Sequence, residues 1–201
     1  MNKQFLGTQY GGWVIDLDSI KDGDTIICGG AGEDITFEEA LMRHKKVNII
    51  EVDPTVKSHK FLESKLKQYD NITLIKSAIE KDGVESITLF KNSNKDHVSE
   101  SVFNEHTSVV SNGTSYETPC VSIKTLREKY NPSFIKIDIE GSKYNVIDEL
   151  IGVKQICIEF HHHCIPDKTS KDTNAIITKF INAGYQILDS RNLHEITFLK
   201  Q

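Results

Sequence analysis

The chain has 201 residues, of which 38% are hydrophobic and 26% charged, with a formal net charge of −5. This composition is typical of a globular protein long enough to bury a large core, so we expect a single domain over residues 1–201. The acidic balance argues against a nucleic-acid partner, which would call for a basic face. No leader-type segment follows Met1 and no apolar run approaches the ~18 residues of a membrane span, so we expect a cytoplasmic protein without a span.

Strands and helices alternate along the chain, which predicts an α/β fold with a largely parallel sheet and helices on both faces. After an N-terminal segment (1–20), the expected elements are strands at 25–28, 47–52, 72–76, 134–138 and 155–160, and helices at 34–45, 55–69, 125–130, 142–150 and 173–183. Residues 185–188 and 196–199 should close the chain as an antiparallel hairpin. The polar interval 91–118 interrupts the alternation, and loops this long inside a domain are usually functional.

A glycine-rich turn, Gly30-Ala31-Gly32, follows the first expected strand and precedes the first helix. This arrangement places backbone N–H groups and a helix N-terminus against a bound ligand. Asp53 lies 21 residues after Gly32, close to the roughly 20-residue offset at which a carboxylate meets the ribose of a nucleotide-type cofactor. The pattern predicts an adenosine-containing cofactor. A turn that only links a strand to a helix is the alternative.

The residues after the turn distinguish between cofactors. A dinucleotide fingerprint needs a third glycine at position 35, which is Ile35 here. Glu33 and Asp34 would repel a pyrophosphate but tolerate a zwitterionic or cationic ligand. S-adenosylmethionine, which carries an amino group and a sulfonium, therefore suits the turn better than NAD.

Polar or glycine-rich segments follow every expected parallel strand, at the edge of the sheet where ligands bind in open α/β folds. These segments are 30–32, Asp53, 77–78, 138–141 and 159–163. Strand alternation puts Lys136 and Asp138 on the same face. Lys136 is therefore either a paired structural charge or part of the site. The four cysteines have no Cys-x-x-Cys spacing, so we expect reduced thiols and no zinc site.

Residues 135–142, Ile-Lys-Ile-Asp-Ile-Glu-Gly-Ser, resemble the Lys-x-Asp-x-Glu-Gly signature of the FkbM-type methyltransferases. Other segments resemble that family in the same order: Tyr-Gly-Gly-Trp at 10–13, the glycine turn with Glu-Asp and Phe-Glu at 30–38, Asp-Pro-Thr at 53–55, His-Val-Ser at 97–99, Pro-Cys at 119–120 and Glu-Phe-His-His at 159–162. The resemblance covers nearly the whole chain. Where the family often has an acidic residue, this chain has Lys143, to which we assign no role.

The resemblance implies a class I methyltransferase (Rossmann-like) fold with a mostly parallel seven-stranded sheet. It implies S-adenosylmethionine-dependent O-methylation, commonly of sugar hydroxyls in surface polysaccharides or related metabolites. The cofactor residues that it indicates are Gly30, Ala31, Gly32, Glu33, Asp34, Asp53, Pro54, Ser77 and Ala78. The acceptor residues are His97 and Ser99, within the 91–118 loop region, and Tyr10 and Trp13 of the N-terminal segment, although Tyr10 and Trp13 could equally be packed on the domain.

A sugar hydroxyl is a poor nucleophile until its proton is removed, by a general base or by a metal that stabilises the alkoxide. The catalytic candidates are Asp138, Glu140, His161, His162 and Lys136. Asp138, Glu159 and His161 could instead hold Mg²⁺ or Mn²⁺. Consecutive histidines cannot all face one way, so we expect His163 to be an exposed loop residue.

Other functions stay open. The acceptor could be a protein, lipid or nucleic-acid group, of which nucleic acid suits the acidic charge least. A cofactor-binding scaffold without turnover is a further alternative, favoured by Lys143 and opposed by the intact Asp138, Glu140 and Glu159. The expected partner is a small-molecule or sugar-nucleotide acceptor, and pairing into a homodimer is common for methyltransferases of this size.

Overall fold

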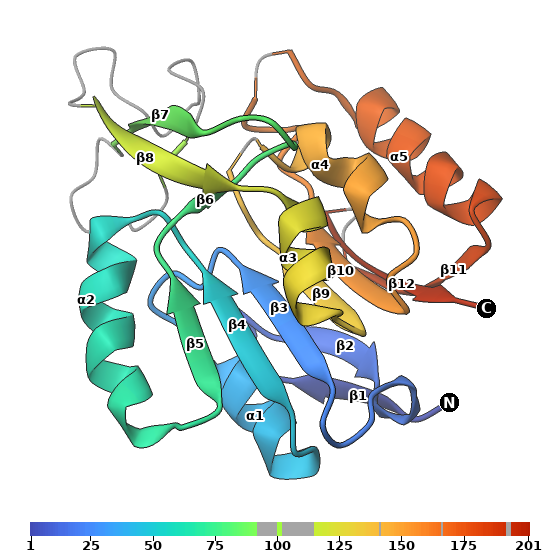
Figure 1. Cartoon of the computed structure of the whole chain (residues 1–201). Coiled ribbons are helices and arrows are strands. Elements are labelled where there is room, and N and C mark those ends of the chain that lie inside the picture. The colour runs from blue at the N-terminus through green and yellow to red at the C-terminus, as the bar shows by residue number, and fades with distance from the viewer. Residues whose placement is uncertain (92–99, 102–114, 141, 166, 192–193) are drawn as a thin grey trace.

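The computed structural model describes residues 1–91, 100–101, 115–140, 142–165, 167–191 and 194–201, and Figure 1 shows their arrangement. A seven-stranded sheet lies at the centre, in the order β11-β12-β10-β9-β3-β4-β5. Its strands are β3 (Thr25–Gly29), β4 (Asn48–Val52), β5 (Ile72–Ile75), β9 (Phe134–Ile137), β10 (Gln155–Glu159), β11 (Tyr185–Arg191) and β12 (Glu195–Lys200). β12 is antiparallel to both neighbours, and the other neighbouring pairs are parallel. The predicted α/β fold and closing hairpin are confirmed.

Helices cover both faces of the sheet, as predicted. They are α1 (Thr36–His44), α2 (Val56–Lys65), α3 (Ile123–Tyr130), α4 (Lys143–Leu150) and α5 (Ser170–Asn182), with 3₁₀ turns at Leu17–Ser19 and Leu66–Gln68. Because successive strand residues point to opposite faces, Ile27 and Ile135 pack with α3, α4 and α5. Ile26 and Phe134 pack with α1 on the other face. No helix among the described residues is both long and apolar enough to cross a membrane.

Side-chain caps begin several helices where the sequence indicates. The Thr55 hydroxyl accepts a hydrogen bond from the Ser58 N–H at the start of α2. Thr169 and Asp172 form a reciprocal capping box at the start of α5, three residues before the expected start of that helix. α1 begins at Thr36 rather than at 34, because the Asp34 carboxylate accepts the Thr36 N–H and so remains outside the helix.

The N-terminal segment contains a hairpin that the sequence analysis did not identify, formed by β1 (Lys3–Leu6) and β2 (Trp13–Asp16). It lies over the same face as α1, where Trp13 is part of the apolar core. The Thr197 hydroxyl donates to the Val14 carbonyl at 2.8 Å, and the Asp16 N–H donates to the Gln155 side chain at 2.7 Å. These bonds attach the hairpin to β10 and β12.

A second, three-stranded sheet lies above the end of β5 (Figure 1) and contains β6 (Ala78–Ile79), β7 (Ser86–Phe90) and β8 (Ser115–Val121). β8 corrects the expectation of loops throughout 91–118, because residues 115–118 are part of this strand. Tyr116 and Thr118 favour extended backbone, and each pairs with β7. The short strands gave too weak a pattern to be recognised among the polar residues around them.

Candidate active site

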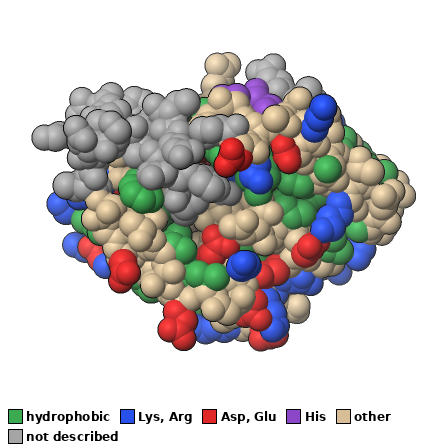
Figure 2. Space-filling model, turned by 90° about the horizontal axis from the view of Figure 1, so that it is seen from above, with side chains coloured by type: hydrophobic (Ala, Val, Ile, Leu, Met, Phe, Trp, Pro, Cys, Tyr) green, Lys and Arg blue, Asp and Glu red, His purple; other side chains and the backbone are tan. Residues whose placement is uncertain are grey.

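A cavity of about 960 Å³ opens at the carboxyl ends of the parallel strands. Figure 2 shows the molecule from this end, with acidic side chains and histidines at the surface. Among the predicted cofactor residues, those that line the cavity are Gly30, Ala31, Gly32, Glu33, Asp34, Asp53, Pro54 and Ala78. Ser77 does not line it, and its N–H instead donates to the Ile75 carbonyl at 3.1 Å. The roles of all these residues stay predictions.

The glycine turn follows β3, and at Gly30 the chain after β9 approaches it closely. Gly30 has φ +83°, and a Cβ there would lie 1.7 Å from the Asp138 carbonyl oxygen. Gly32 has φ +57° and donates its N–H to the Asp53 carboxylate at 3.0 Å. The turn therefore requires glycine at position 30, both for its conformation and for the close approach of the chain after β9.

Asp53 is buried at the end of β4 with its carboxylate held in one orientation. Oδ1 accepts the Thr55 N–H at 2.8 Å and the Thr55 hydroxyl at 2.7 Å, and Oδ2 accepts the N–H of Gly32. A carboxylate oxygen has two lone pairs, so Oδ2 retains capacity for one further donor from the cavity. This geometry fits a ribose hydroxyl.

The two acidic residues after the turn also bind neighbouring parts of the chain. Glu33 pairs with Lys57 of α2 at 3.3 Å. Asp34 accepts hydrogen bonds from Thr36 and, at 3.0 Å, from the Thr8 hydroxyl. Desolvation opposes ionisation of Asp34, but these hydrogen bonds outweigh it and lower its pKa. Asp34 thus anchors the segment that carries Tyr10 over the cavity.

Tyr10 and Trp13 both line the cavity, but in different environments. Tyr10 is 88% exposed, whereas Trp13 is 5% exposed and belongs to the core. Trp13 therefore has the packing role that the sequence analysis left open, while Tyr10 is free to contact a ligand. His97 and Ser99 lie outside the described residues, and their prediction stays untested.

Three predicted catalytic or metal-binding residues meet at the ends of β9 and β10. His161 is buried, with its Nε2 at 3.3 Å from a Glu159 oxygen and 3.9 Å from an Asp138 oxygen. Its Nδ1 lies 3.3 Å from Glu140. Desolvation and the adjacent Glu159 raise the pKa of Asp138 to about 7. All four of these residues line the cavity.

Lys143 is a member of this cluster that the sequence analysis did not assign. It is the first residue of α4, its side chain is fully buried, and its Nζ contacts Nδ1 of His161. Desolvation lowers the pKa of Lys143, against the opposing influence of Asp138 and Glu140. Nothing in the sequence indicated that Lys143 is buried beside His161, because a lysine on a short helix is usually exposed.

His162 does not join the cluster, and this placement does not support its predicted catalytic role. Its Nδ1 is 2.9 Å from the Thr173 hydroxyl on α5, and its ring stacks on His194. The reason is the change of direction after β10, which turns consecutive side chains to different sides. His163 is exposed, as expected, and lies edge-on to His194.

From the sequence, Lys136 could be either a paired structural charge or part of the site. In the structure it forms an ion pair. Its Nζ is 2.7 Å from a Glu38 oxygen of α1, and both side chains are buried. Burial alone would lower the pKa of Lys136, but Glu38 and other nearby acidic groups raise it. Lys136 also lines the cavity, so a catalytic role remains only a prediction, which this pairing does not favour.

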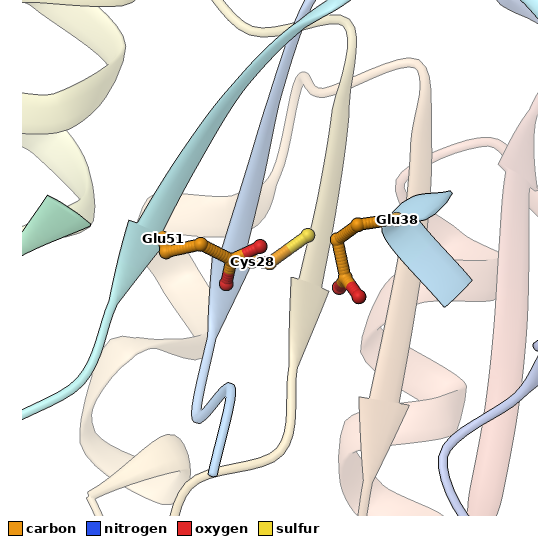
Figure 3. Close-up of side chains that lie close together, drawn as sticks. All are labelled: Cys28, Glu38 and Glu51. Atoms are coloured by element: carbon orange, nitrogen blue, oxygen red, sulfur yellow. The ribbon is translucent and has the colours of Figure 1, made fainter. Parts of the chain in front are cut away.

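Beneath the glycine turn, Cys28 lies between the carboxylates of Glu51 and Glu38 (Figure 3), and all three side chains are fully buried. Neither oxygen of Glu51 has a hydrogen-bond partner among the described residues. Desolvation, followed by the repulsion of Glu38, raises the pKa of Glu51 well above its usual value. The four cysteines, all of which the structure describes, form no disulfide.

The cavity also contains residues that the sequence analysis missed. They are Phe61 and Lys65 of α2, Ile79, Ile87 and Leu89 of the second sheet, and Glu100. No local motif identifies them, because they meet only when the second sheet folds over the end of β5.

Comparisons with known proteins agree with this architecture. The structure is similar to that of precorrin-6y C5,15-methyltransferase from Geobacter metallireducens GS-15, with a TM-score of 0.52 and 13% identity over 90% of this chain and 82% of that one. It is also similar to the Methanococcus jannaschii fibrillarin pre-rRNA processing protein, with a TM-score of 0.51 and 11% identity over 92% of this chain and 70% of that one. At these identities the likeness concerns the fold alone. No curated protein matches the sequence.

The sequence itself matches a family model. Residues 24–187 match the model of a family described as "Methyltransferase FkbM domain". This span begins just before β3, so it includes the glycine turn and the ends of the parallel strands at the cavity. The chain therefore belongs to the FkbM methyltransferase domain family.

Proposed function

We propose that this protein transfers a methyl group from S-adenosylmethionine to a hydroxyl of a sugar or sugar nucleotide. The observation that carries the proposal is a single cavity that contains both the glycine turn with Asp53 and the cluster of Asp138, Glu159 and His161. Transfer to a hydroxyl needs a positioned donor and a nearby proton acceptor. The two ends of this cavity supply residues suited to each.

The residues at the first end fit the cofactor. S-adenosylmethionine supplies, when bound, a methyl group on a positively charged sulfur. No described atom lies within 4 Å of a Cβ built at Gly32, so the turn leaves space there, and Asp53 has a lone pair available for a ribose hydroxyl. The acidic lining favours a cationic ligand over a pyrophosphate.

At the second end, we assign Asp138 as the proton acceptor. Both nitrogens of His161 already face protein groups, Lys143 at Nδ1 and Glu159 at Nε2. The Asp138 side chain is 40% exposed, against 9% for His161. As the bond from the acceptor oxygen to the methyl carbon forms and the carbon–sulfur bond breaks, the hydroxyl proton passes to Asp138. The other carboxylates, which accept hydrogen bonds, suit a polyhydroxylated acceptor.

The cofactor is tested by calorimetric titration of S-adenosylhomocysteine. We expect micromolar binding to the natural chain and at least about tenfold weaker binding to Asp53→Ala, because a charge-assisted hydrogen bond contributes about 1.5–3 kcal/mol. Asp18→Ala, which alters an exposed carboxylate that does not line the cavity, is the matched control. A folded natural chain that does not bind would refute the proposal.

The acceptor is tested with a panel of sugars and nucleotide sugars and mass detection of methylated product. Asp138→Asn should lower kcat about 10²–10⁴-fold, the usual contribution of a general base, with little change in S-adenosylhomocysteine affinity. Asp148→Asn, an exposed carboxylate on α4, is the control. Turnover only with non-sugar acceptors would overturn the sugar assignment and leave the cofactor assignment intact.

A further inference from the structure

Three side chains of metal-ligand type meet in the core beneath the glycine turn. Cys28 and Glu51 are partners in the register of β3 and β4, so they point to the same face of the sheet, which α1 covers with Glu38. All three side chains are fully buried, and one ligand atom from each lies within 4.8 Å of the other two (Figure 3). None of them lines the cavity, so binding of a cofactor or acceptor does not explain their arrangement.

The carboxylates of this cluster have oxygen atoms without partners. Both oxygens of Glu51 and Oε2 of Glu38 form no hydrogen bond within the described part of the chain. Buried polar atoms are almost always hydrogen-bonded, because otherwise they lose their hydration without replacement. A proton on Glu51 would remove a charge, but its O–H group would still lack an acceptor. Three such oxygens beside one thiol therefore point to a bound group that the protein side chains do not supply.

The charges of the cluster indicate a divalent cation. Metal ligands are deprotonated, so as ligands Cys28, Glu38 and Glu51 carry three negative charges. Lys136, whose Nζ lies 2.7 Å from Oε1 of Glu38, supplies one positive charge. A divalent ion neutralises the remaining two. It also leaves the pair with Lys136 intact, because Glu38 can bind the ion through its other oxygen, Oε2.

The thiol indicates which divalent ion the cluster suits. Mg²⁺ and Ca²⁺ take oxygen ligands, whereas a thiolate favours Zn²⁺ and similar transition ions. Zinc bonds are about 2.3 Å to sulfur and about 2.0–2.2 Å to carboxylate oxygen, so ligand atoms that share one ion are separated by less than two such bonds. The 4.8 Å limit on the separations in this cluster is close to that value. The sequence has no Cys-x-x-Cys spacing for such a site, because the ligands come from three separate elements.

We propose that Cys28, Glu38 and Glu51 bind one Zn²⁺ ion, which stabilises the fold. The ion connects β3, β4 and α1, the elements that adjoin the glycine turn and Asp53. Its role is structural, because its ligands are fully buried and none of them reaches the cavity. Structural zinc sites contribute directly to folding free energy. The inference does not depend on the proposed function, since the site lies outside the cavity.

Co²⁺, which can replace Zn²⁺ and absorbs in the near ultraviolet when bound to a thiolate, tests this inference. The chain is produced in medium supplemented with Co²⁺, so that the ion is present when the core folds. The natural chain should contain about one Co²⁺ ion, by plasma mass spectrometry, and show the thiolate–cobalt absorption. The absorption should be lost in Cys28→Ala and in Glu51→Gln. A natural chain without it would overturn the inference, as would absorption that persists in folded Cys28→Ala.

Two control variants distinguish this site from other ligands in the chain. The triple variant Cys120→Ala, Cys157→Ala and Cys164→Ala retains Cys28 as its only thiol, and it should keep the absorption. Asp138→Asn alters the other acidic cluster and should also keep it. Loss of the absorption in either folded control would place the ion elsewhere and overturn the inference. If Cys28→Ala does not fold, the natural chain and the triple variant decide.

Urea unfolding tests the structural role, because unfolding opens the buried site to exchange. The midpoint of the natural chain should be lower in EDTA than in Zn²⁺, whereas that of Glu51→Gln should not differ between the two. In EDTA a proton takes the place of the ion on Glu51, whose pKa burial raises. Equal midpoints of the natural chain in EDTA and in Zn²⁺ would overturn the inference.

These measurements need neither the cofactor nor turnover. If the natural chain binds no S-adenosylhomocysteine, the proposed function fails, while the cobalt absorption still tests the site of Cys28. If the cofactor binds and the natural chain shows no thiolate–cobalt absorption, the zinc site fails and the proposed function stands.

Discussion

The Asp53 carboxylate accepts a hydrogen bond of 3.0 Å from the backbone N–H of Gly32, and this bond joins the end of β4 to the turn after β3. The turn is thereby held in shape by the same residue that is predicted to bind the ribose. Pre-organisation of this kind lowers the entropic cost of binding a ligand. Within this turn, Gly30 is the position at which an added side chain is least tolerated.

Gly30→Ala should abolish S-adenosylhomocysteine binding and lower the unfolding temperature. Its Cβ would collide with the Asp138 carbonyl, at 1.7 Å, and its φ of +83° is unfavourable for alanine. Gly23→Ala is the matched control, with φ +89° and nothing within 4 Å of the added carbon. The control should lose only about 1–2 kcal/mol of stability and bind normally. Equal effects in both variants, by calorimetry and thermal melts, would contradict this account.

Lys136→Met should destabilise the protein by about 3–5 kcal/mol, because it leaves Glu38 charged and buried without its partner. The double variant Lys136→Met with Glu38→Leu should recover much of the loss, since no unpaired charge remains. Urea unfolding of the single and double variants measures both effects. A catalytic role without a structural one would instead lower kcat and leave the unfolding midpoint unchanged.

Glu51→Gln should stabilise the protein above about pH 4.5, the ordinary pKa of glutamate. Burial raises the folded-state pKa of Glu51, so keeping the carboxyl protonated in the folded chain costs free energy as the pH rises from that value toward the folded pKa. Glutamine has no such cost. Urea midpoints at pH 5, 6, 7 and 8 should therefore show a gain that grows with pH, and Glu117→Gln, at an exposed glutamate, is measured beside it as the control. A gain that does not change with pH would exclude this explanation.

Tyr10→Ala and Trp13→Ala separate two roles at the mouth of the cavity. Trp13→Ala removes a buried ring and should lose about 3–5 kcal/mol of stability. Tyr10→Ala alters an exposed side chain, so its unfolding free energy should stay within about 0.5 kcal/mol while KM for the acceptor rises. Chemical denaturation and steady-state kinetics test the pair. An unchanged KM in Tyr10→Ala would remove Tyr10 from the acceptor site.

Much of the fold and the cofactor end of the site could be predicted from the sequence. The turn at 30–32 and Asp53 are local features of strand–turn–helix units, and the carboxyl ends of parallel strands meet at one edge of the sheet. Knowing where each strand ends was therefore enough to expect Asp138 and His161 in one place. The N-terminal hairpin and second sheet escaped this reasoning, because β6 has only two residues and β1 and β8 each bury a single residue, which leaves a weak apolar pattern.

By itself, the sequence determined the order of the strands of the central sheet and of the helices, the glycine turn and the family, since these depend on residues close together along the chain. Only the tertiary structure decided which charges are paired. Lys136 meets Glu38 across 98 residues, and Lys143 meets His161 only because α4 begins beside the end of β10. Side-chain direction at a strand end depends on register and on how the chain turns afterwards, which is why His161 enters the site while His162 contacts α5.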